Sequence, residues 1–391
     1  MKIAYLSMLG IGNPKAASGT PYFIAKALGK KYGDVIDISP RALDEGGRLD
    51  RFKRDPAYMV KQNINRLLKR RTIPCLYRPA YQRVWARQIE SNIAKYKPDI
   101  IFADKCAAFF CYLKTDVPII YRSDATFVLM DGFYPEFSGY SKSDKNLIDV
   151  AERASLLNCT YFIPISEWVK NSAVRDYSIS PEKCMVIRSH ASLANEVSVQ
   201  PKSFDKNIQK IKFLFVGADW HRKGGDLAVE AINNLVKAGY NVEFNILCKS
   251  APSEIKDLPY VNLISFIDRS SESGSRQYHQ LFSEAHFFFM PTKAECMGQV
   301  FIDALMHGLP SIALDVGAVP EVVVPNKTGL LFPVDAGANL MAEKIKSLIS
   351  DPDAYAQIST NAINLYRSEF SSDVFYERLE ILIKRISCKS H

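Results

Sequence analysis

Several features of specialised protein classes are missing from this sequence. None of its 391 residues belong to an apolar run of eighteen, so no segment is suited to a membrane-spanning helix. The eight cysteines include no C-x-x-C pair, and the six histidines show no spacing of a zinc site. This cysteine pattern is typical of reduced thiols, and we expect a cytoplasmic protein. With 47% hydrophobic and 24% charged residues, the chain is an ordinary globular protein whose length predicts two domains.

Positive charge is concentrated in one segment. The net charge is +8, and residues 41–97 hold fifteen Lys and Arg against five Asp and Glu. Three interpretations of residues 51–97 stay open: helices packed on the core with a solvated basic face, attachment to an anionic membrane surface, and, least favoured, binding of nucleic acid. This segment contains two helical patterns. The first has an apolar stripe formed by Val60, Ile64, Leu67 and Leu68, beside the cations Lys61, Lys69, Arg70 and Arg71. The second has an apolar stripe formed by Tyr81, Trp85, Ile89 and Ile93.

Short apolar runs alternate with helical patterns along the whole chain. This alternation predicts an α/β protein with mostly parallel sheets and helices on both faces. The pattern restarts after a polar stretch, so we expect a first domain at 1–195, a linker at 196–209, a second domain at 210–372 and a closing helical segment at 373–391. Strands are expected at 2–7, 35–38, 100–103, 118–121, 161–165, 212–217, 242–247, 261–267, 286–290 and 311–314, with helices at 21–31, 226–238, 353–370 and 373–386.

The most informative segment is Glu295-Cys-Met-Gly-Gln-Val-Phe-Ile-Asp303, which places two carboxylates eight residues apart around the start of a helix. The backbone N–H groups of Met297, Gly298 and Gln299 would lack intrahelical partners, and the helix dipole adds positive charge there. Such a helix start suits a phosphorylated ligand. Glu295 and Asp303 are better suited to accept hydrogen bonds from sugar hydroxyls.

A second segment of interest is Val216 to Gly225, which lies between an expected strand and an expected helix. Gly217 and the two glycines at its end permit close approach of the backbone to a ligand. Arg222 and Lys223 offer positive charge for a diphosphate. Ligands of open α/β sheets bind at this carboxyl edge.

Together with Gly317-Ala-Val-Pro-Glu321 and Lys327-Thr-Gly-Leu-Leu-Phe332, these segments resemble the retaining glycosyltransferases of family 4. The resemblance implies the GT-B type of fold, two doubly wound Rossmann-like domains facing a central cleft, with the last helix crossing back to the first domain. It implies that Glu295 binds the donor sugar, that Asp303 replaces a glutamate that holds the ribose, and that Lys223 binds the donor pyrophosphate. The family's arginine falls at Ala218 here, so Arg222 is expected to substitute for it.

Two residues of the first domain complete the expected site. Gly19 resembles the family's glycine loop opposite the donor phosphates. Asp124 follows the strand at 118–121, where many relatives place a histidine in contact with donor sugar or acceptor. Asp124 has two interpretations: it accepts a proton from, or orients, an acceptor hydroxyl, or it caps the following turn.

The expected function is therefore retaining, metal-independent transfer of a sugar from a nucleoside diphosphate donor to a hydroxyl on a glycan or lipid-linked acceptor, without a cofactor. The sole Asp-x-Asp, Asp351-Pro-Asp353, is interpreted as a helix cap rather than a metal site. We expect a cytoplasmic protein that binds peripherally to the inner face of a membrane. Two alternatives stay open: a sugar-nucleotide-binding subunit without catalysis, and a nucleotide-sugar epimerase.

Overall fold

The computed structural model describes residues 1–12, 20–40, 55–190, 200–205, 208–269 and 271–388. Its chain divides into two compact units, Met1–Ile187 and Arg188–His391. Part of the expected linker at 196–209, residues 196–199 and 206–207, lies outside the described residues. No helix among the described residues is long and apolar enough to cross a membrane.

A five-stranded parallel sheet forms the centre of the first unit, with the strand order β2-β1-β3-β4-β5. The apolar runs expected to be strands form it because their side chains are buried on both faces, as in β1 and β3. Its elements are β1 (Ile3–Ser7), α1 (Thr20–Tyr32), β2 (Val35–Asp37), α3 (Pro56–Leu67), η3 (Cys75–Tyr77), α4 (Pro79–Tyr96), β3 (Ile100–Asp104), α5 (Ala107–Phe110), β4 (Ile119–Ser123), α6 (Phe127–Met130), η4 (Pro135–Phe137), α7 (Lys142–Asn158), β5 (Tyr161–Pro164), α8 (Glu167–Tyr177) and η5 (Pro181–Lys183).

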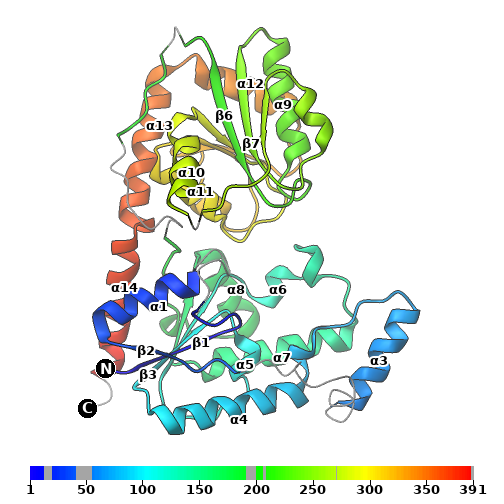
Figure 1. Cartoon of the computed structure of the whole chain (residues 1–391), viewed down its shortest axis with the longest axis vertical. Helices are drawn as coiled ribbons and strands as arrows, with labels where there is room; N and C mark the ends of the chain where they lie inside the picture. Colours follow the sequence, from blue (N-terminus) through cyan, green and yellow to red (C-terminus); the bar gives the residue numbers. More distant parts are fainter. Residues whose placement is uncertain (13–19, 41–54, 191–199, 206–207, 270, 389–391) are drawn as a thin grey trace. The chain divides into compact units, whose positions relative to one another are not determined.

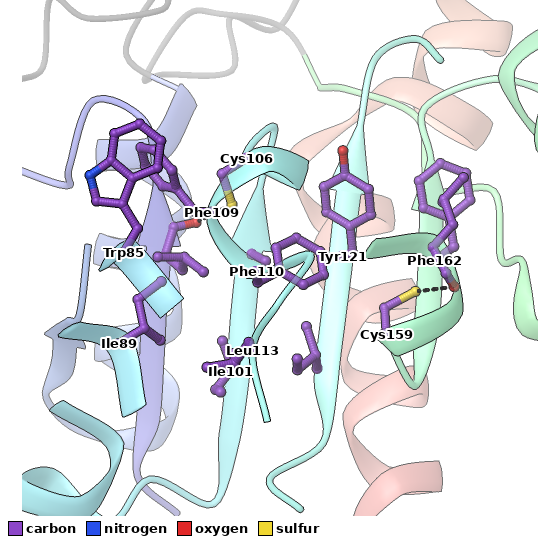
Figure 2. Packing of buried hydrophobic residues seen from close by; sticks show 14 of the residues in the cluster. Trp85, Ile89, Ile101, Cys106, Phe109, Phe110, Leu113, Tyr121, Cys159 and Phe162 are labelled. Carbon is purple, nitrogen blue, oxygen red and sulfur yellow. Dashed lines mark hydrogen bonds between the residues drawn. The ribbon is translucent and has the colours of Figure 1, made fainter. Parts of the chain in front are cut away.

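Aromatic side chains fill the core of this unit. Figure 2 shows Trp85 from α4 packed on Phe109 from α5, with ring centroids 5.0 Å apart, and Phe110 beside Tyr121 at 5.1 Å. The Cys159 thiol donates a hydrogen bond to the Leu156 carbonyl at 3.3 Å. No disulfide joins the eight cysteines, all of which lie in the described ranges.

The second unit is built around a six-stranded parallel sheet with the order β11-β10-β9-β6-β7-β8. Helices α9 and α12 lie side by side on this unit (Figure 1). Its elements are β6 (Ile211–Val216), α9 (Gly225–Lys237), β7 (Val242–Leu247), η6 (Ser253–Asp257), β8 (Val261–Ile264), α10 (Glu272–Glu284), β9 (Phe287–Phe289), α11 (Gln299–Met306), β10 (Ser311–Leu314), η7 (Val319–Glu321), β11 (Gly329–Phe332), α12 (Ala338–Ile349), α13 (Pro352–Leu365), the π-helical turn η8 (Tyr366–Phe370) and α14 (Ser372–Ser387).

Both sheets reverse their winding at one point. In the first unit β1 is followed by β2 on one side and by β3 on the other, and in the second unit β6 has β7 on one side and β9 on the other. Loops leave such a switch point in opposite directions and open a crevice at the carboxyl ends of the strands. The site described below lies at the β6/β9 switch point.

The expected α/β class and parallel sheets are confirmed. The helix expected at 353–370 is α13 continued by the π-helical turn, and its first residue is capped by Asp351, whose carboxylate accepts a hydrogen bond from the Ala354 N–H at 3.0 Å. The cap expected at Asp351 is therefore confirmed. Helix α14 belongs to the second unit, and its crossing to the first domain stays a prediction.

Candidate active site

Two loops meet at the switch point of the second sheet. One follows β6 and carries Arg222 and Lys223, and the other follows β9 and leads to Glu295. The Lys293 N–H donates to the Arg222 carbonyl at 2.8 Å, and the Arg222 guanidinium donates to the Ala294 carbonyl at 2.8 Å. These contacts hold the cationic turn against the segment that precedes α11.

Charged side chains of the two loops form a cluster. Lys223 makes an ion pair with Glu295, and these side chains are only 11% and 13% exposed. Arg222 lies 3.8 Å from the same carboxylate and 3.6 Å from Asp219. Arg222 and Lys223 thus gather beside Glu295 and Asp219, and two cations placed so close together can bind an anionic ligand.

Two glycines allow the cationic turn to pack closely against its neighbours. Gly224 has a left-handed backbone with φ +77, and a Cβ there would lie 2.0 Å from the Pro291 carbonyl oxygen. A Cβ on Gly225 would lie 2.3 Å from the ring of Trp220. Only glycine fits these positions, so the Gly-Gly pair fixes how the turn enters α9.

Trp220 is a structural residue of this turn that the sequence analysis did not single out. Its ring is buried at 1% exposure and packs on Phe215 with centroids 5.4 Å apart. Its indole N–H donates to Asp226 at 2.6 Å, and His221 lies 2.9 Å from the second oxygen of that carboxylate. Burial raises the pKa of the Asp226 carboxyl, but hydrogen bonds from Trp220 and His221 lower it, and the net shift is downward. An ionised Asp226 thus holds the turn at the start of α9.

The helix expected after Glu295 is confirmed as α11, which begins at Gln299 with Gly298 as its N-cap at φ +81. Met297 is buried, and the Gln299 amide donates to the His190 carbonyl at 2.6 Å. A Cβ on Gly298 would lie 2.6 Å from the Phe301 ring. The amino end of α11, with its partial positive charge, therefore stands next to the charged cluster.

Asp303 has an unexpected environment. It is fully buried in α11, and its carboxylate accepts a hydrogen bond from the Tyr278 hydroxyl of α10 at 2.9 Å. Burial and the Asp303 charge hold the pKa of Tyr278 well above its usual range, so the hydroxyl keeps its proton to donate. Asp303 thus ties α10 to α11, and its expected contact with a ribose stays a prediction.

In the first unit Asp124 pairs with Lys105 at 2.7 Å, and about a third of each side chain is exposed. Burial raises the pKa of Asp124, but the charge and hydrogen bond of Lys105 together with the charge of Arg122 lower it, and the net shift is downward. The N-cap of the following helix α6 is Thr126, not Asp124. Behind this pair lies a buried ion pair between Arg122 and Asp104 at 2.8 Å. Gly19, expected near the donor phosphates, lies outside the described residues.

The two basic helices behave differently. In α4 the expected core packing is confirmed, because Tyr81, Trp85 and Ile89 are buried. In and just after α3 the expected packing of the apolar stripe on the core is wrong, because the stripe is exposed to solvent on a helix that lies away from the sheet (Figure 1). Tyr58 and Met59 of the same helix are buried instead. The exposed fractions are 50% for Val60, 49% for Ile64, 83% for Leu67 and 55% for Leu68.

A network of four charges near the start of the second unit was also missed by sequence reasoning. Arg188 pairs with Glu321 at 2.9 Å and with Glu369 at 3.0 Å, and Arg378 pairs with Glu369 at 2.9 Å. Burial raises the pKa of Glu369, but Arg378 and Arg188 lower it, and the net shift is downward. Through its pair with Glu321, Arg188 holds the Gly-Ala-Val-Pro-Glu321 loop.

Within the described ranges no group of three or more His, Cys, Asp or Glu side chains could hold a metal ion. The charges at the switch point are instead Lys223, Arg222 and Glu295. The two cations are of the kind that bind phosphate groups.

Comparison with known proteins agrees with this geometry. Residues 210–351 match the family model described as Glycosyl transferases group 1. The capsular polysaccharide biosynthesis glycosyltransferase CapM of Staphylococcus aureus is 25% identical over 59% of this chain and 62% of its own length. The structure resembles sucrose-phosphate synthase from Thermosynechococcus elongatus with a TM-score of 0.69, 17% identity and full coverage of both chains. It also resembles HepE of Anabaena, solved with UDP, with a TM-score of 0.61, 15% identity, and coverage of 98% and 100%.

Two units, each with a parallel α/β sheet, give this chain the fold of the GT-B type. Residues 210–351 are similar to group 1 glycosyltransferases. The aligned region spans less than two thirds of the length of the curated relative from Staphylococcus.

Proposed function

We propose that this protein is a glycosyltransferase that moves a sugar from a nucleoside diphosphate donor to an acceptor hydroxyl. The observation that carries the proposal is the cluster of Lys223, Arg222 and Glu295 beside the amino end of α11, at the switch point of the second sheet. The solved neighbour HepE was obtained with UDP, which supports a nucleoside diphosphate as the donor's leaving group.

The proposed reaction breaks the bond between the anomeric carbon and a diphosphate oxygen. A new bond forms between that carbon and the acceptor oxygen on the same face of the sugar, and the acceptor proton passes to the departing diphosphate. Negative charge grows on the diphosphate as the bond breaks, and Lys223, Arg222 and the α11 N–H groups would stabilise it by several kcal/mol. Glu295 would accept hydrogen bonds from the sugar hydroxyls.

The same charges support transfer without a metal ion. A divalent ion in other transferases neutralises the leaving diphosphate. In this protein two cationic side chains and a helix start are available for that task. We therefore propose transfer without a metal and without a cofactor beyond the donor itself.

The acceptor is proposed to be a hydroxyl on a glycan or a lipid-linked sugar. Asp124 is the proposed positioning group, because its lowered pKa keeps the carboxylate ionised and able to accept a hydrogen bond. The same lowered pKa makes Asp124 a weak base. Its proposed role is therefore to orient the acceptor hydroxyl rather than to remove its proton.

The exposed stripe of Val60, Ile64, Leu67 and Leu68 supports peripheral attachment to a membrane. Exposed Arg66, Lys69 and Arg70 lie among and beside these residues. Apolar side chains that enter the lipid interface, flanked by cations that meet anionic headgroups, are the features of a helix lying on a bilayer. We propose attachment to the inner, cytoplasmic face, the leaflet that carries anionic lipids.

The central experiment is an assay of the purified full chain with a panel of nucleotide sugars, following released nucleoside diphosphate with and without sugar acceptors. Turnover with at least one donor that is lost in Glu295→Ala and kept in Lys237→Ala, a change at an exposed lysine of α9, would support the proposal. Tight nucleotide binding without turnover would instead identify a binding subunit. Inversion of the donor sugar without acceptor would identify an epimerase.

A further inference from the structure

The first unit contains a pocket of about 260 Å³ at the carboxyl ends of β1, β3 and β4. Met8 follows β1, Lys105 follows β3 and Asp124 follows β4, and all three line it. This is the switch point of the first sheet, between β1 and β3, where open α/β sheets bind ligands. The position identifies the pocket as a candidate ligand site on fold grounds alone.

Apolar side chains form most of its wall. Leu76 and Tyr77 come from η3, Phe109 from α5, Phe127 and Met130 from α6, and Phe137 from η4. Phe127 belongs to a small cluster with Ile73 and Ile148, against which Tyr77 and Phe137 pack. The wall is thus held in shape by its own packing, and several of its side chains are aromatic.

The charged groups that line the pocket already have partners within the protein. Lys105, the only cation among the lining residues that the structure describes, is paired with Asp124. Glu152 accepts hydrogen bonds from the Phe127 N–H at 2.6 Å and the Tyr177 hydroxyl at 2.9 Å. Burial raises the pKa of the Glu152 carboxyl to about 7. Among the described lining residues a phosphate or a carboxylate would find no unpaired cation, whereas a neutral ligand would leave every pair intact.

The size of the pocket limits the ligand. A cavity of about 150 Å³ holds one benzene molecule, so about 260 Å³ has room for roughly ten to twelve non-hydrogen atoms. A hydroxyl on such a ligand could donate to Asp124, which is partly exposed at the pocket wall.

We propose that this pocket holds a neutral, apolar part of the acceptor, a hydrocarbon group of about ten carbon atoms close to a hydroxyl. That the ligand is the acceptor rests on the proposed function, whereas the expected preference of the pocket for a neutral apolar alcohol does not. The two sources of such chemistry are an isoprenoid chain and an aromatic ring system.

The test measures binding of three probes to the full chain without donor, by calorimetry and ligand-detected NMR. Geraniol represents an isoprenoid alcohol, 3-phenylpropan-1-ol an aromatic one, and methyl glucoside a polar ring of similar size. Either alcohol should bind at least ten times more tightly than the glucoside, and the tighter of the two identifies the source. Equal binding of all three, or preference for the glucoside, would overturn the proposal.

Two variants locate the binding. Ala125→Phe fills the pocket from a partly exposed lining position and should weaken alcohol binding at least tenfold, whereas Ala57→Phe, at an exposed position in α3 outside the lining, should not. Phe137→Ala removes part of the wall and should weaken binding even if Ala125→Phe fails to fold. Alcohol binding that survives both pocket variants would refute this location. If no donor is turned over but the alcohols still bind and the two pocket variants weaken that binding, the proposed function is refuted and the proposed pocket ligand is supported.

Discussion

Lys223 and Glu295 lie 72 positions apart in the chain and form an ion pair in which both side chains are almost enclosed. In the proposed reaction these partners serve different parts of the donor: the lysine its diphosphate, the glutamate its sugar. Their pairing holds both side chains in place before the donor arrives. Such preorganisation lowers the cost of arranging charge at the moment of reaction.

Replacement of Glu295 by Gln should therefore lower kcat by roughly 100-fold. The neutral amide can neither pair with Lys223 nor accept hydrogen bonds from the sugar hydroxyls as strongly as the carboxylate. Affinity for nucleoside diphosphates should change little, since their phosphates contact the cations. Steady-state kinetics and calorimetry separate the two effects. An unchanged kcat would exclude Glu295 from the reaction.

Replacement of Lys223 by Ala should weaken nucleoside diphosphate binding by roughly 10- to 100-fold, as expected for loss of a charge-assisted contact. The change also leaves Glu295 without its partner, so the double variant Lys223→Met with Glu295→Gln is the matched control. If the double variant is as stable as the wild type and still binds diphosphate poorly, the loss is due to the ligand contact. Normal binding by either variant would contradict the assignment of Lys223.

Gly225→Ala should destabilise the second unit by about 1–3 kcal/mol, because the added methyl overlaps the buried Trp220 ring. Gly337→Ala is the control, since a Cβ there would meet nothing within 4 Å. Denaturant unfolding measures both. Equal stability of the two variants would mean that Trp220 moves aside without cost.

The folded state should lose stability as the pH falls from about 6.5 towards 4. Burial lowers the pKa of His307 to about 4, whereas an unfolded histidine titrates near 6.5, so the unfolded chain binds the extra proton first. The contribution is complete above pH 6.5 and reaches a loss of roughly 3 kcal/mol at pH 4. His307→Gln should flatten this slope relative to wild type, and His221→Gln, at an exposed histidine, should not. Identical slopes in all three proteins would contradict the prediction.

Binding to vesicles with anionic lipid at low salt should weaken at least tenfold in Ile64→Ser with Leu67→Ser, because two exposed apolar anchors are lost. Lys69→Gln with Arg70→Gln should weaken it by a similar factor, about 1 kcal/mol per charge. Arg71 is left unchanged because it hydrogen-bonds the Ser138 carbonyl at 3.1 Å. Leu157→Ser, at an exposed leucine of α7, is the control. Co-sedimentation that is the same for all variants would rule out the stripe as the membrane contact.

The sequence predicted the strands well because parallel strands covered on both faces are continuous apolar runs, as in β1 and β3. It also predicted the start of α11, since a glycine N-cap followed by helical spacing is a local signal. The partners of Asp303 and Arg188 are not local signals. Tyr278 lies 25 positions before Asp303, and Glu369 lies 181 positions after Arg188.

The apolar stripe after Val60 shows a different limit. A period of 3.6 residues indicates that a helix has an apolar face, but not what that face meets. The same period led correctly to burial in α4 and incorrectly to burial in α3. Only the course of the chain around each helix decides between core and solvent.

The bond between Tyr278 and Asp303 also limits how this position can change. Lengthening Asp303 to the glutamate of the family would add a methylene group to a space that is already closed, next to a phenol that needs an acceptor. The longer acid would therefore require a smaller or rearranged neighbour on α10. Residues 278 and 303 should consequently vary together among close relatives, as a unit inherited or replaced in one step.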